Sequence, residues 1–324
     1  MAFLKSKLLG VFFMALSAGT VLAQIWPPAT VRIVVPYPPG TEPDVLARDL
    51  GNALSRQTGK SFVVENKPGA NSIVGTDAVV KAEGDGSTLL MVDRLAVVTN
   101  PQLYSKLPYQ WETALKPVSD LGGVNLFLGV RDGFPVKNLM EFIQYAKANP
   151  KKINVGTGGN GHVNHIGMEM LAQAHGLSFT YVPYKGVGPA VLGLLTGEVD
   201  VVLAGGLALQ SHMKAGKVRG LAVGDTKRAM FMPDVPTLAE AGGKEGAIPS
   251  TVFALFAPAK VPDAVVSQIS QAVAKAMDTS QVRGTYAVRG LEIVTTTPEQ
   301  THSLMKKEAI KYEKIIRDAG IKLE

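Results

Sequence analysis

Three closely spaced glycines stand in the segment INVGTGGNGHVNH, which runs from an apolar stretch into a pair of histidines. Gly156, Gly158 and Gly161 have the G-x-G-x-x-G spacing of dinucleotide-binding loops, where small residues let the backbone approach a pyrophosphate. The two histidines could instead ligate a metal ion, and the backbone N–H groups of the turn could bind another small anion. The chemistry of this segment decides whether the protein is an enzyme.

A dinucleotide site is disfavoured by the residues that follow the glycines. Dinucleotide-binding folds place an acidic residue about 20 residues further on, at the end of the next strand, where it holds ribose hydroxyls. Here the next strand reads FTYVPYKG, with Lys185 where the acid is needed. A phosphate-binding P-loop would end in G-K-[ST], whereas His162 and Val163 follow the last glycine. We therefore expect no nucleotide cofactor.

Catalytic groups are also sparse in the sequence. His162 and His165 could share a metal ion at a helix start, but the nearest acid is Glu169 and the chain has no cysteine. No G-x-S-x-G nucleophile elbow is present. We expect no bound metal and no catalytic residue, so the protein is predicted not to be an enzyme. An exported α/β metal-dependent enzyme that uses the two histidines is the alternative.

With a nucleotide, a metal ion and a catalytic residue disfavoured, anion binding by backbone N–H groups remains as the chemistry expected of three loops. GTGGNG offers several N–H groups between a strand and a helix N-terminus, where unpaired donors and the helix dipole favour a negative group. PYPPGTEPD, residues 36–44, does the same with the N–H groups of Gly40, Thr41 and Glu42. NKPGANS, residues 66–72, is a third loop of this kind. We expect main-chain amides at strand ends to hold a small anion.

Alternating strands and helices must position these loops. Short, continuous apolar runs rich in branched residues are typical of parallel strands covered on both faces. Leu46, Leu50 and Leu54 recur at helical spacing after the first such run, between Pro43 and Gly59. Successive βα units predict right-handed crossovers and an α/β sheet. The expected strands are residues 31–35, 62–65, 88–92, 125–130, 153–155, 179–182, 199–203, 220–223 and 251–257.

The order of these elements predicts an α/β protein of two lobes. Residues 24–124 form the first part of lobe 1, residues 125–225 form lobe 2, and residues 226–324 return to lobe 1 with two amphipathic C-terminal helices. Ligands of open α/β sheets bind beyond the carboxyl ends of the strands. Two such lobes facing one another therefore predict an interlobe ligand cleft.

The N-terminal residues predict export. Lys5 and Lys7 precede a short apolar run, and Val21-Leu22-Ala23 has the small-residue spacing of a cleavage site, so residues 1–23 are interpreted as a signal peptide. The full chain has 33 basic and 27 acidic residues, and loss of the two lysines leaves a net charge of +4. The basic residues are scattered, which excludes nucleic acid as an expected partner and suits a small anionic ligand.

Several segments in order resemble one protein family. WPPATVRIVVPYPPGTEPDVLAR, VVENKPGA, NPQLYSKLPY, YAKANPKKINVGTGGNG, VPYKG, GEVDVVLAG, PDVPTLAEAG and DAGIKLE are similar to the TctC-like solute receptors of tripartite tricarboxylate transporters, the Bordetella uptake gene (Bug) family. The resemblance spans the mature chain. It implies a two-lobed periplasmic binding protein, type II-like, that closes like a Venus flytrap on a small organic carboxylate and delivers it to the transporter's membrane subunits. A monomer is the expected state of such a protein. A ligand-binding partner of a membrane sensor would use the same cleft.

The resemblance also implies which residues bind the ligand. The loop after the first strand and the glycine-rich loop of the other lobe hold one carboxylate in the family, and they correspond to Tyr37–Thr41 and Thr157–His162. The Asn-x-Pro-Gly loop corresponds to Asn66–Ala70, and VPYKG ends at Tyr184–Gly186. The expected ligand-binding residues are Tyr37, Pro38, Gly40, Thr41, Asn66, Gly69, Ala70, Arg94, Thr157, Gly158, Asn160, His162, Tyr184 and Gly205.

Departures from the family's pattern concern the far end of the ligand. Gly40-Thr41 stands where two glycines are usual, and Asp93-Arg94 stands where a small residue is common. Arg94 follows a strand end, so its planar guanidinium could point into the cleft and bind a second carboxylate; a salt bridge with neighbouring Asp93 or a solvated surface position is the alternative. A dicarboxylate or an aromatic carboxylate is the favoured cargo, and His162 and Tyr37 would suit an aromatic acid.

Overall fold

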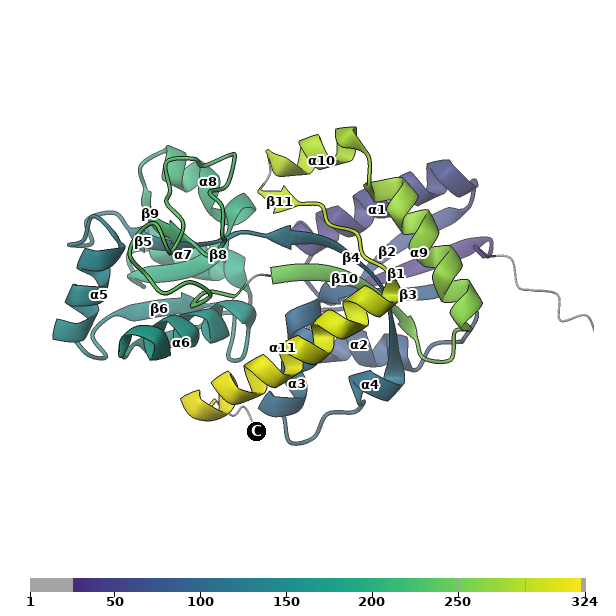
Figure 1. The fold of residues 1–324 in the computed structure, drawn as a ribbon, viewed down its shortest axis with the longest axis horizontal. Helices are drawn as coiled ribbons and strands as arrows, with labels where there is room; N and C mark the ends of the chain where they lie inside the picture. Colours follow the sequence, from purple (N-terminus) through teal and green to yellow (C-terminus); the bar gives the residue numbers. More distant parts are fainter. Residues whose placement is uncertain (1–25, 250, 289, 322–324) are drawn as a thin grey trace, which may run out of the picture.

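The computed structural model describes residues 26–321 except residues 250 and 289. The predicted signal peptide, residues 1–23, lies outside the described residues. The described chain forms two α/β lobes side by side, each built on its own sheet (Figure 1). This arrangement confirms the predicted fold class. Among the described helices, none combines the length and apolar character that a membrane crossing requires.

The sheet of the first lobe mixes parallel and antiparallel strands. Its parallel part pairs β1 with β2 and β3, as the branched apolar runs predict. The antiparallel strand β10 pairs with both β3 and β4, and β11 pairs with β4. The strand order is β11 (Leu291–Glu292), β4 (Leu115–Val124), β10 (Thr251–Pro258), β3 (Thr88–Asp93), β1 (Thr30–Val35) and β2 (Ser61–Asn66).

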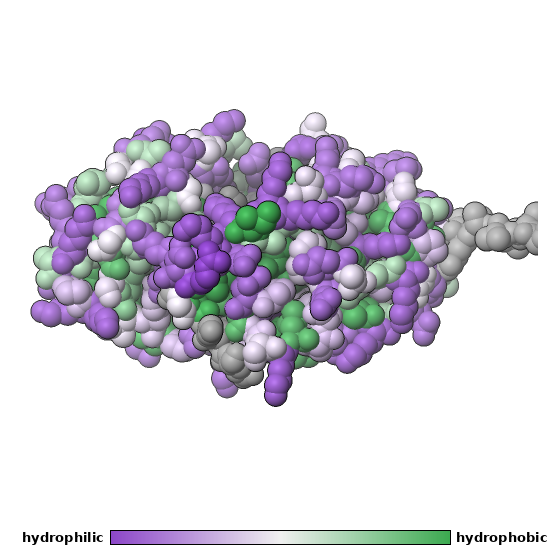
Figure 2. Space-filling view, turned by 60° about the horizontal axis from the view of Figure 1, so that its bottom comes forward, coloured by the Kyte–Doolittle hydropathy of each residue, from purple (hydrophilic) through white to green (hydrophobic). Residues whose placement is uncertain are grey.

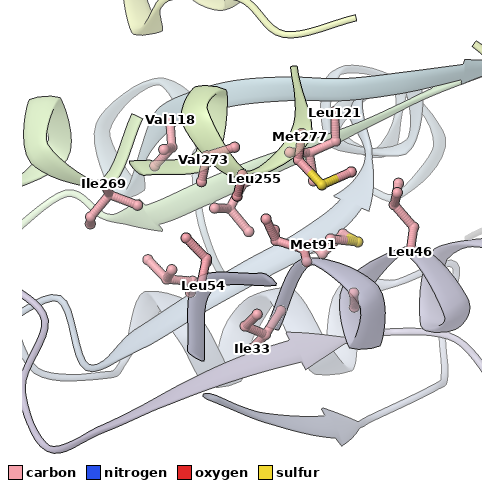
Figure 3. Packing of buried hydrophobic residues seen from close by; sticks show 14 of the residues in the cluster. Ile33, Leu46, Leu54, Met91, Val118, Leu121, Leu255, Ile269, Val273 and Met277 are labelled. Carbon is pink, nitrogen blue, oxygen red and sulfur yellow. The ribbon is translucent and has the colours of Figure 1, made fainter. Parts of the chain in front are cut away.

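Helices cover both faces of this sheet. Leu46 and Leu54 of one helix pack with Ile33 and Met91 of the strands and with Ile269 of a second helix in a single apolar cluster (Figure 3). The helices of this lobe are α1 (Glu42–Thr58), α2 (Ile73–Val80), α3 (Arg94–Leu103), α4 (Trp111–Ala114), α9 (Asp263–Met277), α10 (Ser280–Ala287) and α11 (Pro298–Ala319). Helix α1 has proline in its first turn and ends at Gly59 in the left-handed region, φ 69°, as its sequence predicts.

The second lobe carries a smaller sheet of the same kind. Its strand order is β7 (Thr180–Pro183), β6 (Asn154–Thr157), β8 (Val201–Gly205), β5 (Leu126–Arg131) and β9 (Val218–Val223). Strands β6, β7 and β8 are parallel, and β5 runs antiparallel to β8 and β9. The helices are α5 (Leu139–Ala148), α6 (Val163–His175), α7 (Val187–Thr196) and α8 (Gly206–Lys214).

The segment after β9 packs on the second lobe and not on the first. Val223 forms a parallel bridge with Thr237, and Leu238 and Ile248 lie in the apolar core of the second lobe. The boundary predicted at residue 225 is therefore wrong. The chain returns to the first lobe at β10, about 25 residues later.

The two lobes are connected side by side. The chain leaves the first lobe between Val124 and Leu126 and comes back between Pro249 and Thr251. Val124 and Thr251 are paired residues of β4 and β10, so the two connections are neighbours in one sheet. Helix α11 also reaches the second lobe, where its Ile315 carbonyl accepts a hydrogen bond of 3.1 Å from Gln173 of α6. Polar residues cover most of the face shown in Figure 2, across both lobes.

Candidate functional site

A cavity of about 440 Å³ lies between the lobes. Both lobes and both connections contribute to its walls. The first lobe supplies the loop between β1 and α1 together with Asp93, and the connections supply Val124, Leu126, Thr251 and Phe253. The second lobe supplies the N-terminal ends of α6, α7 and α8, through residues 162–164, 185–189, 203–205, 207 and 208. The predicted interlobe cleft is therefore present, at the carboxyl ends of the parallel strands.

The loop from Tyr37 to Pro43 forms the first-lobe wall. Gly40 has a φ of 81°, which a side chain would strain, and its N–H donates to Asp44 Oδ2 over 2.8 Å. Thr41 precedes α1 but its hydroxyl donates to the Pro38 carbonyl, so no side chain caps this helix among the described residues. The first turn of α1 therefore presents its N–H groups and the positive end of its dipole to a negative group.

Asp44 and Asn66 hold this loop in place. The Asn66 amide donates to Asp44 Oδ1 over 2.8 Å and to the Tyr37 carbonyl over 3.1 Å. Burial alone would raise the pKa of Asp44, but hydrogen bonds from Arg48, Gly40 and Asn66 outweigh it and lower the pKa. Asn66 thus supports the binding loop from behind.

The glycine-rich loop of the second lobe is organised differently from the prediction. Its amides are already engaged: the N–H of Gly158 donates to Asn164 Oδ1 at 3.1 Å, and that of Gly161 donates to His165 Nδ1 at 3.0 Å. The N–H of His162 donates to the Gly159 carbonyl at 3.2 Å. These three amides are therefore engaged within the protein, two of them by side chains of α6, and are not available to an anion in this arrangement.

Asn164 is the polar side chain that this loop offers instead. It lines the cavity and is 1 % exposed, and its Nδ2 has no hydrogen-bond partner within the described part of the chain. Thr251, at the start of β10, also lines the cavity, and its hydroxyl is buried and similarly unpartnered. Buried polar groups are ordinarily hydrogen-bonded, so both atoms suit a polar ligand.

Helix α7 provides a second uncapped N-terminus. Gly186 has a φ of 112°, and its N–H donates to the Gly158 carbonyl at 3.1 Å, which fixes the start of α7 against the glycine-rich loop. No side chain caps α7 in the described residues, and Lys185 lies beside it on the cavity wall. The N–H groups of Val187 and Gly188 and a positive charge therefore come together at this point.

Helix α8 is different, because an acid of the other lobe lies at its start. The carboxylate of Glu42, which belongs to the first turn of α1, lies against Gly205 at the N-terminus of α8 and close to the Leu207 N–H. Burial raises the pKa of Glu42 to about 7, although the nearby Leu207 N–H opposes this shift. A Cβ on Gly205 would overlap with the Glu42 carboxylate, so this close approach requires glycine.

The structure divides the predicted site residues into two groups. The cavity is lined by Tyr37, Pro38, Gly40, Thr41, His162 and Gly205. Within the described residues, the cavity walls do not include Asn66, Gly69, Ala70, Arg94, Thr157, Gly158, Asn160 or Tyr184. Sequence reasoning did not assign a ligand-binding side chain to Glu42, Asp93, Asn164, Lys185 or Phe253, which the structure adds.

Arg94 lies in an ion-pair network away from the cavity. Its guanidinium donates to Glu308 of α11 through Nε at 2.8 Å and Nη2 at 2.7 Å, and it also donates to Asp120 of β4. The side chain is 6 % exposed, so these carboxylates satisfy it inside the first lobe. The prediction that Arg94 points into the cleft is wrong.

The two histidines hold the loop through hydrogen bonds. His162 Nδ1 lies 2.9 Å from Asn164 Oδ1, and the ring of His165 packs edge-on against Tyr181 with centroids 4.5 Å apart. Burial lowers the pKa of both rings, in His165 to about 4, where nearby His162 lowers it further. The described residues contain no group of three or more His, Cys, Asp or Glu side chains placed to hold a metal ion.

Comparison with known proteins identifies similar sequences and structures. The family described as "Tripartite tricarboxylate transporter family receptor" matches residues 46–321. The Bordetella pertussis protein BugT is 32% identical over 308 residues, which cover 95% of this chain and 94% of BugT. The structure of the periplasmic binding protein BugD superposes with a TM-score of 0.83 at 29% identity, covering 92% of this chain and 100% of BugD. R. palustris Rpa4515 with adipate superposes with a TM-score of 0.85 at 29% identity, with the same coverage of 92% and 100%.

Proposed function

Since this chain belongs to the TctC family of tripartite tricarboxylate transporter receptors, we propose that it binds a small organic carboxylate in the cavity between its lobes and delivers it to the membrane subunits of such a transporter. The family is one of solute receptors and not of enzymes. We propose that this member likewise has no catalytic activity of its own. The carboxylate in the related adipate-bound structure supports the class of cargo.

The uncapped N-termini of α1 and α7 carry this proposal. They come from different lobes, reach the same cavity, and have no side-chain cap among the described residues. A carboxylate between them would accept hydrogen bonds from both lobes, with Lys185 and Asn164 Nδ2 beside it. A ligand held by both lobes binds the closed arrangement better than the open one, which is how cargo selects the transport-competent form.

The remaining cavity wall favours an aromatic acid over a dicarboxylate. Tyr37, Leu126, Val187 and Phe253 all line it, whereas Lys185 is the single Lys or Arg side chain among the described lining residues. An aromatic ring would bury its apolar surface against these side chains. We propose a monomer for the working receptor, because the cavity needs residues of one chain alone.

A periplasmic location agrees with this function. Periplasmic binding proteins meet their cargo outside the cytoplasmic membrane, and the related BugD is described as one. The predicted signal peptide lies outside the described residues, and we propose that it directs export.

A panel of small organic acids tests the function directly. A bound acid stabilises the folded protein by mass action, so a thermal-shift screen of the purified mature protein should identify cargo, and calorimetry should then give its Kd. A panel of monocarboxylates, dicarboxylates and aromatic acids that neither raises the unfolding midpoint nor gives binding heat would contradict the proposal.

One backbone donor can be removed to locate the carboxylate. Val187→Pro deletes the N–H at the first position of α7, where proline fits the helix. Loss of one charge-assisted hydrogen bond is expected to weaken binding by roughly tenfold to a hundredfold. Ser280→Pro, at the first position of the exposed start of α10, is the matched control and should keep the original affinity. An unchanged Kd in Val187→Pro would place the carboxylate elsewhere.

A further inference from the structure

Glu42 bridges the lobes inside the cavity. Its backbone belongs to α1 of the first lobe, while its carboxylate lies at the start of α8 in the second lobe, close to the Leu207 N–H. The carboxylate lies against Gly205, where an added Cβ would overlap with both of its oxygens. The Glu42 carboxylate therefore occupies the N-terminal turn of α8.

The position that Glu42 occupies would otherwise suit a ligand carboxylate. Helix N-termini attract anions through unpaired N–H groups and the helix dipole. Four helices direct their N-termini at the cavity, and their capping differs. His162 caps α6 and the Glu42 carboxylate lies at the start of α8, while no side chain caps α1 or α7 in the described residues. The chain has thus filled one of its anion positions with an acid of its own.

The other charged groups on the cavity wall also indicate that the site favours one ligand carboxylate over two. Among the described lining residues, Glu42 and Asp93 are acidic, Lys185 is basic, and His162 is a histidine whose pKa is lowered by burial. One carboxylate of a ligand can be placed between α1 and α7 near Lys185. A second carboxylate directed at α8 would meet the Glu42 carboxylate, and like charges at short range in a partly buried site repel strongly.

We propose that Glu42 determines specificity by taking the anion position at α8, so that the cargo carries one carboxylate and presents a hydrogen-bond donor, such as an amide or ammonium group, to Glu42. This inference rests on the proposed function, because it concerns the far end of a carboxylate ligand in the same cavity. An ionised carboxylate at this position is an acceptor only, and it has lone pairs available for a donor from the ligand. While it is ionised it also penalises an acceptor there, since two acceptors cannot share a hydrogen bond.

Matched ligand pairs test the inference. Terephthalate and para-carbamoylbenzoate share one ring and one carboxylate but end in a second carboxylate or an amide; adipate and ε-aminocaproate form an aliphatic pair. Calorimetric titrations at about pH 8 keep Glu42 ionised. We expect the donor-bearing member of at least one pair to bind the wild-type protein about tenfold or more tightly than its dicarboxylate partner.

Variants assign the preference to Glu42. Glu42→Gln keeps the shape and removes the charge, so the ratio of the two Kd values should fall to within about threefold. Glu42→Ser has a side chain too short to extend to α8, so it should also bring the ratio of the two Kd values to within about threefold. It serves as the second variant if Glu42→Gln is unstable. Glu112→Gln changes an exposed acid on α4 and should keep the wild-type ratio. Thermal midpoints without ligand show that each variant is folded.

The outcomes separate this inference from the proposed function. If dicarboxylates bind the wild-type protein as tightly as their donor-bearing partners, or if the Glu42 variants keep the wild-type ratio, Glu42 does not set specificity and the receptor function stands. If no carboxylate binds the wild-type protein, the proposed function fails and this inference with it.

Discussion

Asn66 donates a hydrogen bond of 2.8 Å to Asp44, although the first residue ends β2 and the second lies in the first turn of α1. The same amide donates to the Tyr37 carbonyl, and Arg48 donates to Asn66 Oδ1 at 3.0 Å. One side chain therefore fixes the start of α1 relative to the sheet. The direction in which the uncapped end of α1 faces the cavity depends on this connection.

Replacing Asn66 should weaken both the fold and the binding site. Asn66→Ala removes two donated bonds and leaves Asp44, which is 2 % exposed, with fewer partners. We expect a loss of about 1–3 kcal/mol in the free energy of unfolding and a weaker affinity for the carboxylate, because the α1 end is no longer fixed. Urea denaturation and calorimetry measure the two effects. Asn52→Ala, at an exposed position of α1, is the control. Equal losses of stability and of affinity in the two variants would refute this role of Asn66.

Replacing Arg94 should affect stability and not specificity. Arg94→Met leaves Asp120, which is 3 % exposed, and Glu308 without their cation. Breaking a buried ion pair from one side costs about 3–5 kcal/mol. Arg228→Met breaks the exposed pair with Glu240 and should cost under about 1 kcal/mol. Affinities for mono- and dicarboxylates should change by the same factor in Arg94→Met. A selective loss of dicarboxylate binding would show instead that Arg94 contacts the ligand.

Asp93 should make stability depend on pH. Burial raises the pKa of this carboxyl to about 7, and Glu308 raises it further, while hydrogen bonds and Arg94 oppose the shift. Between about pH 4 and pH 7 the folded protein keeps a proton that the unfolded chain releases, so this group lowers stability as the pH rises through that window.

Asp93→Asn tests that pH dependence. The side chain accepts from the Leu95 N–H at 3.0 Å, and asparagine can keep this cap while losing the titration. The free energy of unfolding, measured with urea at several pH values, should fall less steeply in the variant between about pH 4 and pH 7. Glu42, whose pKa is also raised to about 7, contributes in the same direction and remains in both proteins. Parallel curves for the two proteins would exclude Asp93 as a source of the effect.

Gly205 should be required for the closed arrangement. A methyl group there would meet the Glu42 carboxylate and the Val124 side chain, so Gly205→Ala forces the lobes apart at α8. We expect cargo affinity to fall by about tenfold or more, because the ligand must then close a strained cavity. Gly284→Ala on α10 meets nothing within 4 Å and is the control. Calorimetry on both variants decides, and an unaltered Kd in Gly205→Ala would mean that the contact is not part of the bound state.

The strands and the helix α1 could be predicted because their apolar residues recur with the period of their secondary structure. The lobe boundary could not be predicted in the same way. The segment after β9 is rich in proline and glycine and has no period, and its place is fixed by Leu238 and Ile248 entering the core of the second lobe. Such long-range packing leaves no local pattern in the sequence.

In the site, too, local sequence patterns predicted some features, whereas features that depend on distant residues could not be predicted. Glycines at strand ends indicated the loops around Gly40 and Gly186, which line the cavity, because a positive φ favours glycine there. Which amides remain available could not be read from the loops themselves. Asn164 and His165, on the next helix, accept the N–H groups of the glycine-rich loop, and Arg94 is bound by a carboxylate 214 positions away.

The contact between α6 and α11 has a consequence for the empty receptor. Ile166 and Met170 of α6, in the second lobe, pack in one apolar cluster with Met305 and Tyr312 of α11, which begins on the first. Any rotation that separates these helices would expose both α6 side chains to water, at about 1.5–3 kcal/mol for each. The connections at Val124 and Thr251 cross side by side in one sheet. Opening the cleft therefore carries a cost in exposed apolar surface at α6 and α11, which adds to the preference of a ligand for the closed arrangement.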